Sequence, residues 1–185
     1  MQMLKDAILE RGKAINQDIL LVDSFLNHQV DVALMKTVGE TFAEHFANRG
    51  STRVGTSESS GIAPASFTAL ALGLPLVIMK KQTSRILNGD LLQTTVRSFT
   101  KGTEYQLSVK HEFLNADDNI LLIDDFLASG EAAFGVITLA EQVGAKIGGV
   151  GIVIEKAFQS GHKRLEDAGL DVYSLARIDR KRVGW

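Results

Sequence analysis

The chain has 185 residues, and its 20 lysines and arginines against 22 aspartates and glutamates give a formal net charge of −2. This length favours a single domain, and the absence of cysteine excludes disulfides, thiolate metal sites and a cysteine nucleophile. The near-neutral charge offers no basic face to nucleic acid or to a membrane surface, so we expect neither partner. The absence of cysteine is consistent with a reducing compartment, and we expect a cytoplasmic protein.

The first third of the chain is predicted to contain two helices separated by an apolar stretch. Apolar residues at helical spacing indicate a short helix over residues 1–11 that ends near Gly12. After the apolar residues 19–26, a stronger helix begins at Asp31 and ends before Gly50. Its predicted buried stripe consists of Leu34, Met35, Val38, Phe42 and Phe46.

Strand and helix patterns alternate from residue 52 onwards. Short strands are predicted at 52–57 and 76–79, with an alanine-rich helix between them. Residues 80–92 show neither the helical nor the strand spacing of apolar residues, and we expect an exposed loop there. Polar and apolar residues alternate at 94–100 and 106–110, which is typical of two antiparallel strands with one polar face.

The last third continues the alternation. Buried strands are predicted at 119–124, 147–154 and 171–178. A helix running to about Val143 and a second helix at 161–168 separate them. Strands and helices joined by short links predict an α/β fold, with a mostly parallel central sheet flanked by helices.

The most informative segment follows the strand at 119–124. Two carboxylates, Asp124 and Asp125, are expected at the carboxyl end of this strand, where open parallel sheets bind their ligands. Ser129 and Gly130 then open a helix, whose first free N–H groups form a phosphate cradle. Carboxylates beside such a cradle suit a ribose 5-phosphate, which carries hydroxyls and a phosphate. The alternative is that the two aspartates only end a strand and that the Ser-Gly turn only caps a helix.

The run Leu-Leu-Ile-Asp-Asp-x-x-x-Ser-Gly at 121–130 resembles the fingerprint of the type I phosphoribosyltransferases. Segments 22–31, 58–64 and 151–158 resemble the bacterial members of that family that use xanthine. The resemblance implies the type I phosphoribosyltransferase fold, formed by residues 1–185 as one domain. It also implies that the segment at about 1–35 contributes to a small hood over the base, and that two copies form a homodimer.

The resemblance assigns roles to the motif and to three other residues. Asp124 and Asp125 are the implied catalytic residues, in contact with the ribose hydroxyls of phosphoribosyl pyrophosphate. The loop implied to bind its 5-phosphate consists of Ala128, Ser129, Gly130, Glu131 and Ala132. The implied contacts to the purine base are Leu20, Asn27 and Lys156. From the residues alone, Leu20 is a core residue, Asn27 a turn residue, and Lys156 a surface lysine paired with Glu155.

Two further regions are implied to complete the site. Ser59, Ser60 and Gly61 match the loop that binds pyrophosphate in the family, and a serine that caps the next helix is the alternative. Lys80 and Lys81 begin a region that closes over the reacting centre in the family, with Lys81 assigned to the pyrophosphate. A solvated pair of charges is the alternative for these lysines.

The implied reaction transfers the 5-phosphoribosyl group from phosphoribosyl pyrophosphate to xanthine in purine salvage. Its products are xanthosine 5′-monophosphate and pyrophosphate, and Mg²⁺ is expected to arrive with the substrate, without a dedicated protein metal site. The alternatives are transfer to guanine, hypoxanthine or adenine, a non-catalytic regulator that senses phosphoribosyl pyrophosphate, and a domain like those of response regulators. Ala128 stands where hypoxanthine–guanine enzymes carry a carboxylate, which puts a general-base role of this loop in doubt.

Phe158 and the histidines are expected to have structural roles only. Phe158 is predicted to pack in the core rather than against a base. The four histidines lack metal-binding spacing, so we assign them no metal or acid–base role.

Overall fold

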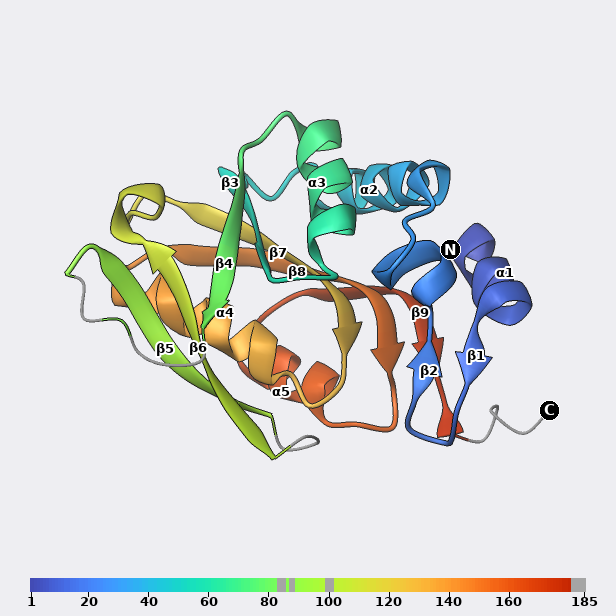
Figure 1. The fold of residues 1–185 in the computed structure, drawn as a ribbon. Coiled ribbons are helices and arrows are strands. Elements are labelled where there is room, and N and C mark those ends of the chain that lie inside the picture. Colours follow the sequence, from blue (N-terminus) through green and yellow to red (C-terminus); the bar gives the residue numbers. More distant parts are fainter. Residues whose placement is uncertain (83–85, 87–88, 99–101, 181–185) are drawn as a thin grey trace.

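A seven-stranded sheet forms the centre of the protein. The computed structural model describes residues 1–82, 86, 89–98 and 102–180. The strand order is β5-β6-β4-β3-β7-β8-β9 (Figure 1). Five neighbouring strands run parallel: β4 (Leu76–Gln82), β3 (Arg53–Ser57), β7 (Asn119–Leu127), β8 (Lys146–Lys156) and β9 (Val172–Ile178). The antiparallel edge consists of β5 (Leu91–Ser98) and β6 (Thr103–Lys110).

Helices cover both faces of the sheet, as the sequence predicts. One face carries α2 (Val32–Phe46) and α3 (Ile62–Leu72), and the other carries α4 (Glu131–Gln142) and α5 (Gly161–Asp167) (Figure 1). The side chains of β7 alternate between two cores: Leu121 and Ile123 pack with the α2 and α3 side, whereas Ile120 and Leu122 pack with the α4 side. This double burial explains the unbroken aliphatic run before Asp124, because both faces of the strand are covered.

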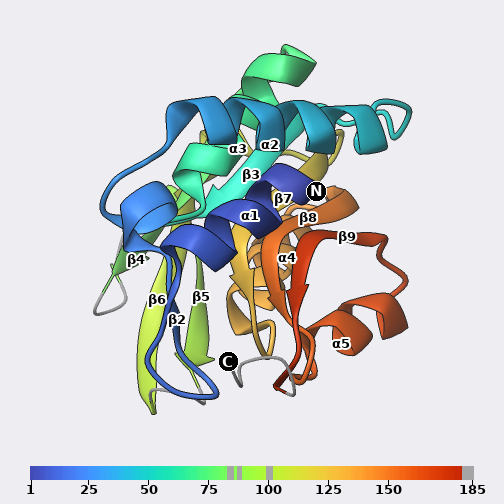
Figure 2. The ribbon, with the colours of Figure 1, turned by 90° about the vertical axis from the view of Figure 1, so that its right-hand side faces the viewer.

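The N-terminal segment forms a small layer beside β9 (Figure 2). It contains α1 (Gln2–Arg11), the two-residue strands β1 (Lys13–Ala14) and β2 (Leu20–Leu21), and a π-helix, Asp23–Asn27. The N-terminal ammonium donates a hydrogen bond of 2.8 Å to the carbonyl of Leu175 in β9. This segment therefore lies where a hood over the end of the sheet would have to lie, and its contact with a base stays a prediction.

The longer helices confirm the predicted periodicity. Asp31 is the N-cap of α2 and accepts a 3.1 Å hydrogen bond from the N–H of Leu34. The whole predicted stripe of α2 is buried. The sequence did not predict the short hairpin and the π-helix, because two-residue strands and a single π-turn leave no periodic pattern. Among the described residues, no helix has the length and apolar character that crossing a membrane requires.

The prediction of a loop over residues 80–92 is partly wrong. The strand β4 continues to Gln82 and β5 already begins at Leu91. Both extensions are held by β6, which pairs Lys81 with Leu107 and Leu91 with Lys110. Polar residues are tolerated there because the pair forms an exposed edge. Residues 83–85 and 87–88, which belong to the predicted closing loop, and residues 99–100 of the predicted strand 94–100 lie outside the described residues. A 3-10 helix, His111–Phe113, follows β6.

Candidate active site

The strand β7 extends past its neighbour β3 and carries the acidic pair on this extension. It pairs with β3 only from Ile120 to Leu122, but it pairs with β8 as far as Leu127. The strand predicted to end at Asp124 therefore continues for three more residues, to Leu127. The two aspartates lie on a section of β7 that has a strand on one side only, so its other side is open to the turn that follows β3.

Asp124 is buried against that turn. A Cβ atom at Gly61 would lie 2.7 Å from Asp124 Oδ1 and 2.5 Å from Thr56 Oγ1, so only glycine fits between them. The N–H of Asp125 donates to Asp124 Oδ1 at 3.0 Å. Burial, and then the charge of Asp125, raises the pKa of Asp124 well above the usual range, while Lys81 opposes this shift. The fold thus brings the acidic pair and the predicted pyrophosphate loop into contact.

Gly61 itself is the N-cap of α3, and no side chain caps this helix. The alternative that Ser59 or Ser60 serves as the cap is therefore wrong.

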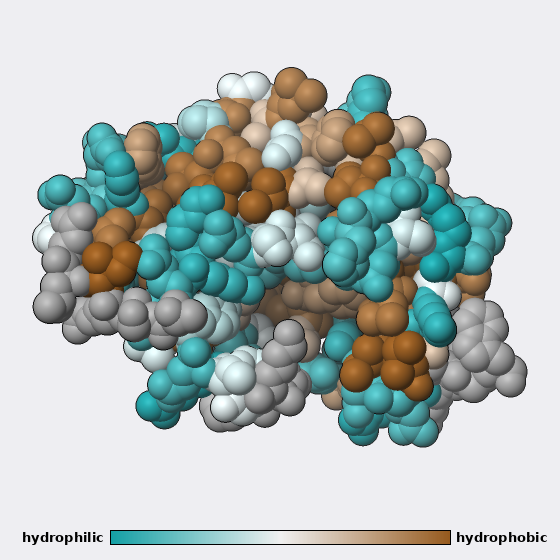
Figure 3. Space-filling model, in the orientation of Figure 1, coloured by the Kyte–Doolittle hydropathy of each residue, from teal (hydrophilic) through white to brown (hydrophobic). Residues whose placement is uncertain are grey.

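The phosphate loop closes one side of a cavity of about 290 Å³. Gly130 adopts a φ of +92°, a left-handed conformation that favours glycine, and α4 begins directly after it. The loop residues implied to bind the 5-phosphate, 128–132, all line the cavity, and so do Asp124, Lys81 and Tyr105. Figure 3 shows this face of the molecule hollowed between the β5–β6 pair and the N-terminal hairpin. The structure therefore gathers Asp124, the phosphate loop and Lys81 around one space that is open to solvent, whereas Asp125 does not line it.

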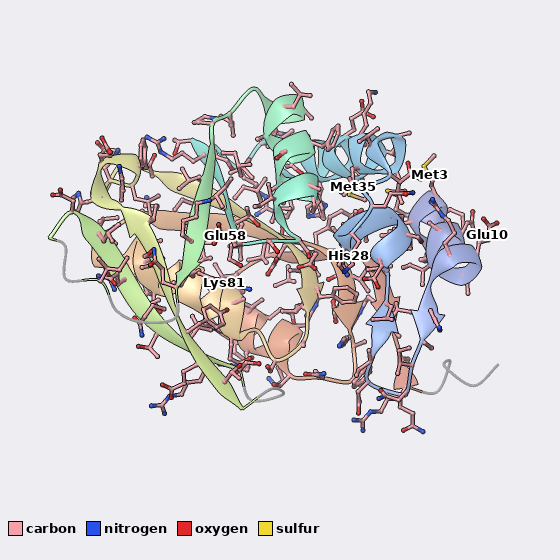
Figure 4. The ribbon with its side chains drawn as sticks, viewed as in Figure 1. Met3, Glu10, His28, Met35, Glu58 and Lys81 are labelled. Carbon is pink, nitrogen blue, oxygen red and sulfur yellow. The ribbon has the colours of Figure 1, made fainter. Side chains whose placement is uncertain are left out.

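The two lysines at 80 and 81 lie at the end of β4 rather than in a loop. Lys80 forms a 2.9 Å ion pair with Glu58, and the N–H of Lys81 donates to the other carboxylate oxygen of Glu58 at 2.8 Å. The hydrogen bond from Lys80 lowers the pKa of Glu58. Figure 4 shows Glu58 and Lys81 near one another at the carboxyl end of β4. The Lys81 ammonium lies 5.0 Å from the ring centroid of Tyr105, and both residues line the cavity.

A second cavity of about 290 Å³ lies between the N-terminal segment and the ends of β8 and β9. Leu20, Lys156, Phe158 and Ile178 line it. Lys156 donates to the carbonyl of Asp18 at 2.8 Å, and burial lowers its pKa. Phe158 is half-buried beside this cavity, so the prediction that it packs in the core is wrong.

The structure also tests the alternative for Lys156 and places Asn27. Lys156 does not pair with Glu155, whose buried carboxylate instead accepts from Ser174 at 2.6 Å and lies 2.8 Å from His162 Nδ1. The alternative of a Lys156–Glu155 pair is therefore wrong. Asn27 is exposed in the π-helix and does not line the second cavity. Its contact to a base remains a prediction.

Comparison with known proteins supplies the family. No family model matches the chain. The chain is 56% identical over 184 residues to a xanthine phosphoribosyltransferase of Clostridium botulinum (strain Eklund 17B), and the alignment covers 100% of this chain and 97% of the relative. It is 50% identical over 178 residues to a xanthine phosphoribosyltransferase of Listeria monocytogenes (serotype 4b, strain F2365), covering 96% and 93% of the two chains. The chain belongs to the xanthine phosphoribosyltransferase family.

Solved structures confirm the phosphoribosyltransferase fold. An adenine phosphoribosyltransferase from Thermoanaerobacter pseudethanolicus superposes with a TM-score of 0.77 at 18% identity, covering 95% of this chain and 99% of the other. One from Giardia lamblia, complexed with 9-deazaadenine, gives a TM-score of 0.79 at 22% identity, covering 95% and 97%. At this identity the likeness shows the fold alone. The predicted fold class is confirmed.

Three residues near the predicted site of this phosphoribosyltransferase were not predicted from the sequence. Tyr105 and Phe126 line the first cavity. The ring centroid of Phe126 also lies 5.6 Å from the ammonium of Lys156, which lines the second cavity, so Phe126 lies close to both. Arg164, on α5, forms a 2.8 Å ion pair with Glu131 of the phosphate loop. Phe126 stands inside the motif, where its place between the aspartates and the loop is the one clue. Tyr105 and Arg164 lie on other elements, and only the fold brings them to the site.

Proposed function

We propose that this protein transfers the 5-phosphoribosyl group from phosphoribosyl pyrophosphate to xanthine in purine salvage, giving xanthosine 5′-monophosphate and pyrophosphate. The observation that carries the proposal is the gathering of these groups at the carboxyl ends of β7 and β8. The phosphate loop and Asp124 line the first cavity, and Lys156 lines the second, with its ammonium 5.6 Å from the ring centroid of Phe126 in the first. Membership of the family supports xanthine as the base.

The acidic pair serves the ribose. Bond breaking at the anomeric carbon ahead of bond making leaves oxocarbenium-like positive charge on the sugar. Asp124 is buried, so water screens little of the interaction between its carboxylate and a positive charge that develops nearby. Asp125 is half-buried, and we assign it to the ribose hydroxyls on the resemblance of the motif. The two carboxylates thereby fix the sugar and stabilise the transition state more than the ground state.

Lys156 serves the base. Its ammonium donates to the carbonyl of Asp18, and a carbonyl oxygen of xanthine replaces that acceptor when the base binds. Adenine presents an amino group at the corresponding ring position, which is a donor and leaves the lysine without an acceptor. Leu20 and Ile178 supply apolar walls.

Ser59, Ser60, Gly61 and Lys81 are proposed to hold the pyrophosphate. The contact between Gly61 and Asp124 and the position of Lys81 in the first cavity support this assignment.

We also propose that Mg²⁺ accompanies phosphoribosyl pyrophosphate. Among the described residues there is no cluster of three or more histidine, aspartate or glutamate side chains placed to hold a metal. Asp124 and Asp125 fit the usual Mg²⁺ arrangement of one or two carboxylates completed by substrate oxygens and water. When bound, the ion neutralises charge on the leaving pyrophosphate.

The test is turnover of each purine base with phosphoribosyl pyrophosphate and Mg²⁺, followed as nucleotide formation. We expect kcat/KM for xanthine to exceed that for adenine by at least about 10²-fold, because a site built to donate to an oxygen rejects a donor. Equal turnover of all purines contradicts the assignment of xanthine. Binding of phosphoribosyl pyrophosphate without turnover of any base favours the regulator instead. Omission of Mg²⁺ with added chelator is expected to abolish turnover.

Finally, we propose that the protein is a cytoplasmic homodimer. Leu70 of α3 is 77% exposed, and Figure 3 shows hydrophobic residues (brown) gathered over the part of the view where α3 lies. Sedimentation equilibrium at micromolar concentration tests this part of the proposal, and a mass near 20 kDa rather than twice that value contradicts it.

A further inference from the structure

The helix α5 lies directly behind the phosphate loop. Figure 1 shows it beside the first turn of α4. The N–H of Gly161 donates to the carbonyl of Ala128 at 3.0 Å. A Cβ atom at residue 161 would lie 2.4 Å from this carbonyl oxygen and 3.1 Å from the nitrogen of Gly130. The start of α5 is therefore in direct backbone contact with the loop that is proposed to hold the 5-phosphate.

Arg164, one turn further along α5, reaches the same loop with its side chain. Its guanidinium donates to the carbonyl oxygen of Ser129 and forms a 2.8 Å ion pair with Glu131. It also lies 4.7 Å from the ring centroid of Phe134. The Glu131 carboxylate in turn accepts a hydrogen bond from the hydroxyl of Ser129. Arg164 thus holds both the backbone and the acidic side chain of the loop.

Glu131 poses an electrostatic problem for a phosphate site. Its side chain is only 15% exposed, and it lines the cavity that is proposed to take a phosphate dianion. Like charges in a partly desolvated site disfavour one another. Arg164 supplies the opposite charge at 2.8 Å, so the loop presents its N–H groups to the ligand without an uncompensated carboxylate.

The bond to Ser129 has a second effect. In a trans peptide the carbonyl oxygen and the following N–H point in opposite directions. By holding the oxygen of Ser129, Arg164 therefore fixes the N–H of Gly130 on the side of the peptide away from the guanidinium.

We propose that Arg164 is a positioning residue of the phosphoribosyl pyrophosphate site: it neutralises Glu131 and holds the Ser129 peptide, so that the loop is shaped for the 5-phosphate before the ligand arrives. The identity of the ligand rests on the proposed function, whereas the support of the loop by Arg164 does not.

The test compares Arg164→Met with Lys163→Met. Lys163 is the neighbour of Arg164 on α5, is 79% exposed and pairs with Asp167, so its substitution removes the same charge without a contact to the loop. We expect Arg164→Met to weaken the binding of phosphoribosyl pyrophosphate about tenfold, in line with coupling between contacting residues. Both KM for this substrate and its Kd from calorimetry should rise, while kcat and KM for xanthine stay within about twofold. Lys163→Met should bind as the wild type does.

A double-mutant cycle separates charge compensation from general support. In a Glu131→Gln background there is no carboxylate to neutralise, so Arg164→Met should weaken binding by only about threefold there. Arg164→Lys keeps a charge but not the planar fork, and it should restore part of the lost affinity. Equal effects of Arg164→Met in both backgrounds overturn the neutralisation of Glu131.

Hydrogen exchange of the unliganded protein makes the two proposals distinguishable. Arg164→Met should speed exchange of the amides at 128–132 relative to Lys163→Met, because the loop loses its support. Unchanged exchange overturns the role of Arg164 whatever the ligand is. Faster exchange in a protein whose wild type fails to bind phosphoribosyl pyrophosphate supports that role and refutes the proposed function instead.

Discussion

Gly61 offers a way to move the acidic pair without changing its chemistry. Its backbone has a φ of −71°, which alanine adopts without strain, so Gly61→Ala acts through the added methyl group alone. This group would lie 2.7 Å from Asp124 Oδ1, and Thr56 Oγ1 would stand 2.5 Å away on the other side. Neither neighbour has room to give, because both side chains are buried.

The contact distances set the size of the effect. To reach an ordinary contact of ~3.4 Å, the Asp124 carboxylate must move by about 0.7 Å, and displacements of about 1 Å in an active site cost up to about 10²-fold in rate. We therefore expect kcat to fall by about 10- to 100-fold in steady-state assays. Overpacking should also lower the free energy of unfolding by about 1–3 kcal/mol, or Tm by roughly 2–12 °C.

Gly55→Ala is the matched control. A methyl group there, on β3, would lie 2.8 Å from Ile120 Cγ2, a clash of similar size, but it touches no residue of the site. It should lower Tm and leave kcat within about threefold of the wild type. If Gly61→Ala is as active as Gly55→Ala, the packing of Gly61 does not position Asp124 and the reasoning is refuted.

Three further predictions concern single side chains of the site. Asp124→Asn should lower kcat by at least about 10²-fold, yet raise Tm at neutral pH, because it removes a charge that burial and Asp125 disfavour. Since the pKa of Asp124 is raised in the folded state, this stability gain should shrink as the pH falls through that raised pKa; a constant difference in a pH series of melts contradicts the assignment. Lys156→Met should raise KM for xanthine about tenfold or more, and the wild-type KM should rise with pH below the usual lysine range, since burial lowers the pKa of Lys156. Ala128→Asp should shift the base preference toward hypoxanthine or guanine, and an unchanged ratio of kcat/KM values counts against this idea.

The parts of the site that the sequence revealed are contiguous in it. The aliphatic run, the acidic pair and the Ser-Gly turn lie within 11 residues, 120–130, and each has a local physical signature in burial, charge or backbone freedom. Gly61 belongs to a second local pattern, a strand followed by a small-residue turn. The stripe of α2 likewise follows from helical periodicity alone.

The parts that were missed depend on partners far along the chain. Lys81 ends a strand instead of starting a loop because β6, about 26 residues later, supplies hydrogen bonds to it. Arg164 reaches the carbonyl of Ser129 across 35 residues, and nothing on its own short helix marks it. Phe158 has the composition of a core residue, but the end of β8 leaves it at a cavity. Such placements follow from tertiary packing, which one sequence does not encode in any local period.

The connection between β8 and α5 has a consequence for how this protein can change over time. Only residues 157–160 separate Lys156, proposed to contact the base, from Gly161, which binds the carbonyl of Ala128 in the phosphate loop. Any insertion or deletion in these four residues shifts the base end and the phosphate end of the site against one another. We therefore expect relatives with the same activity to keep the length of this connection.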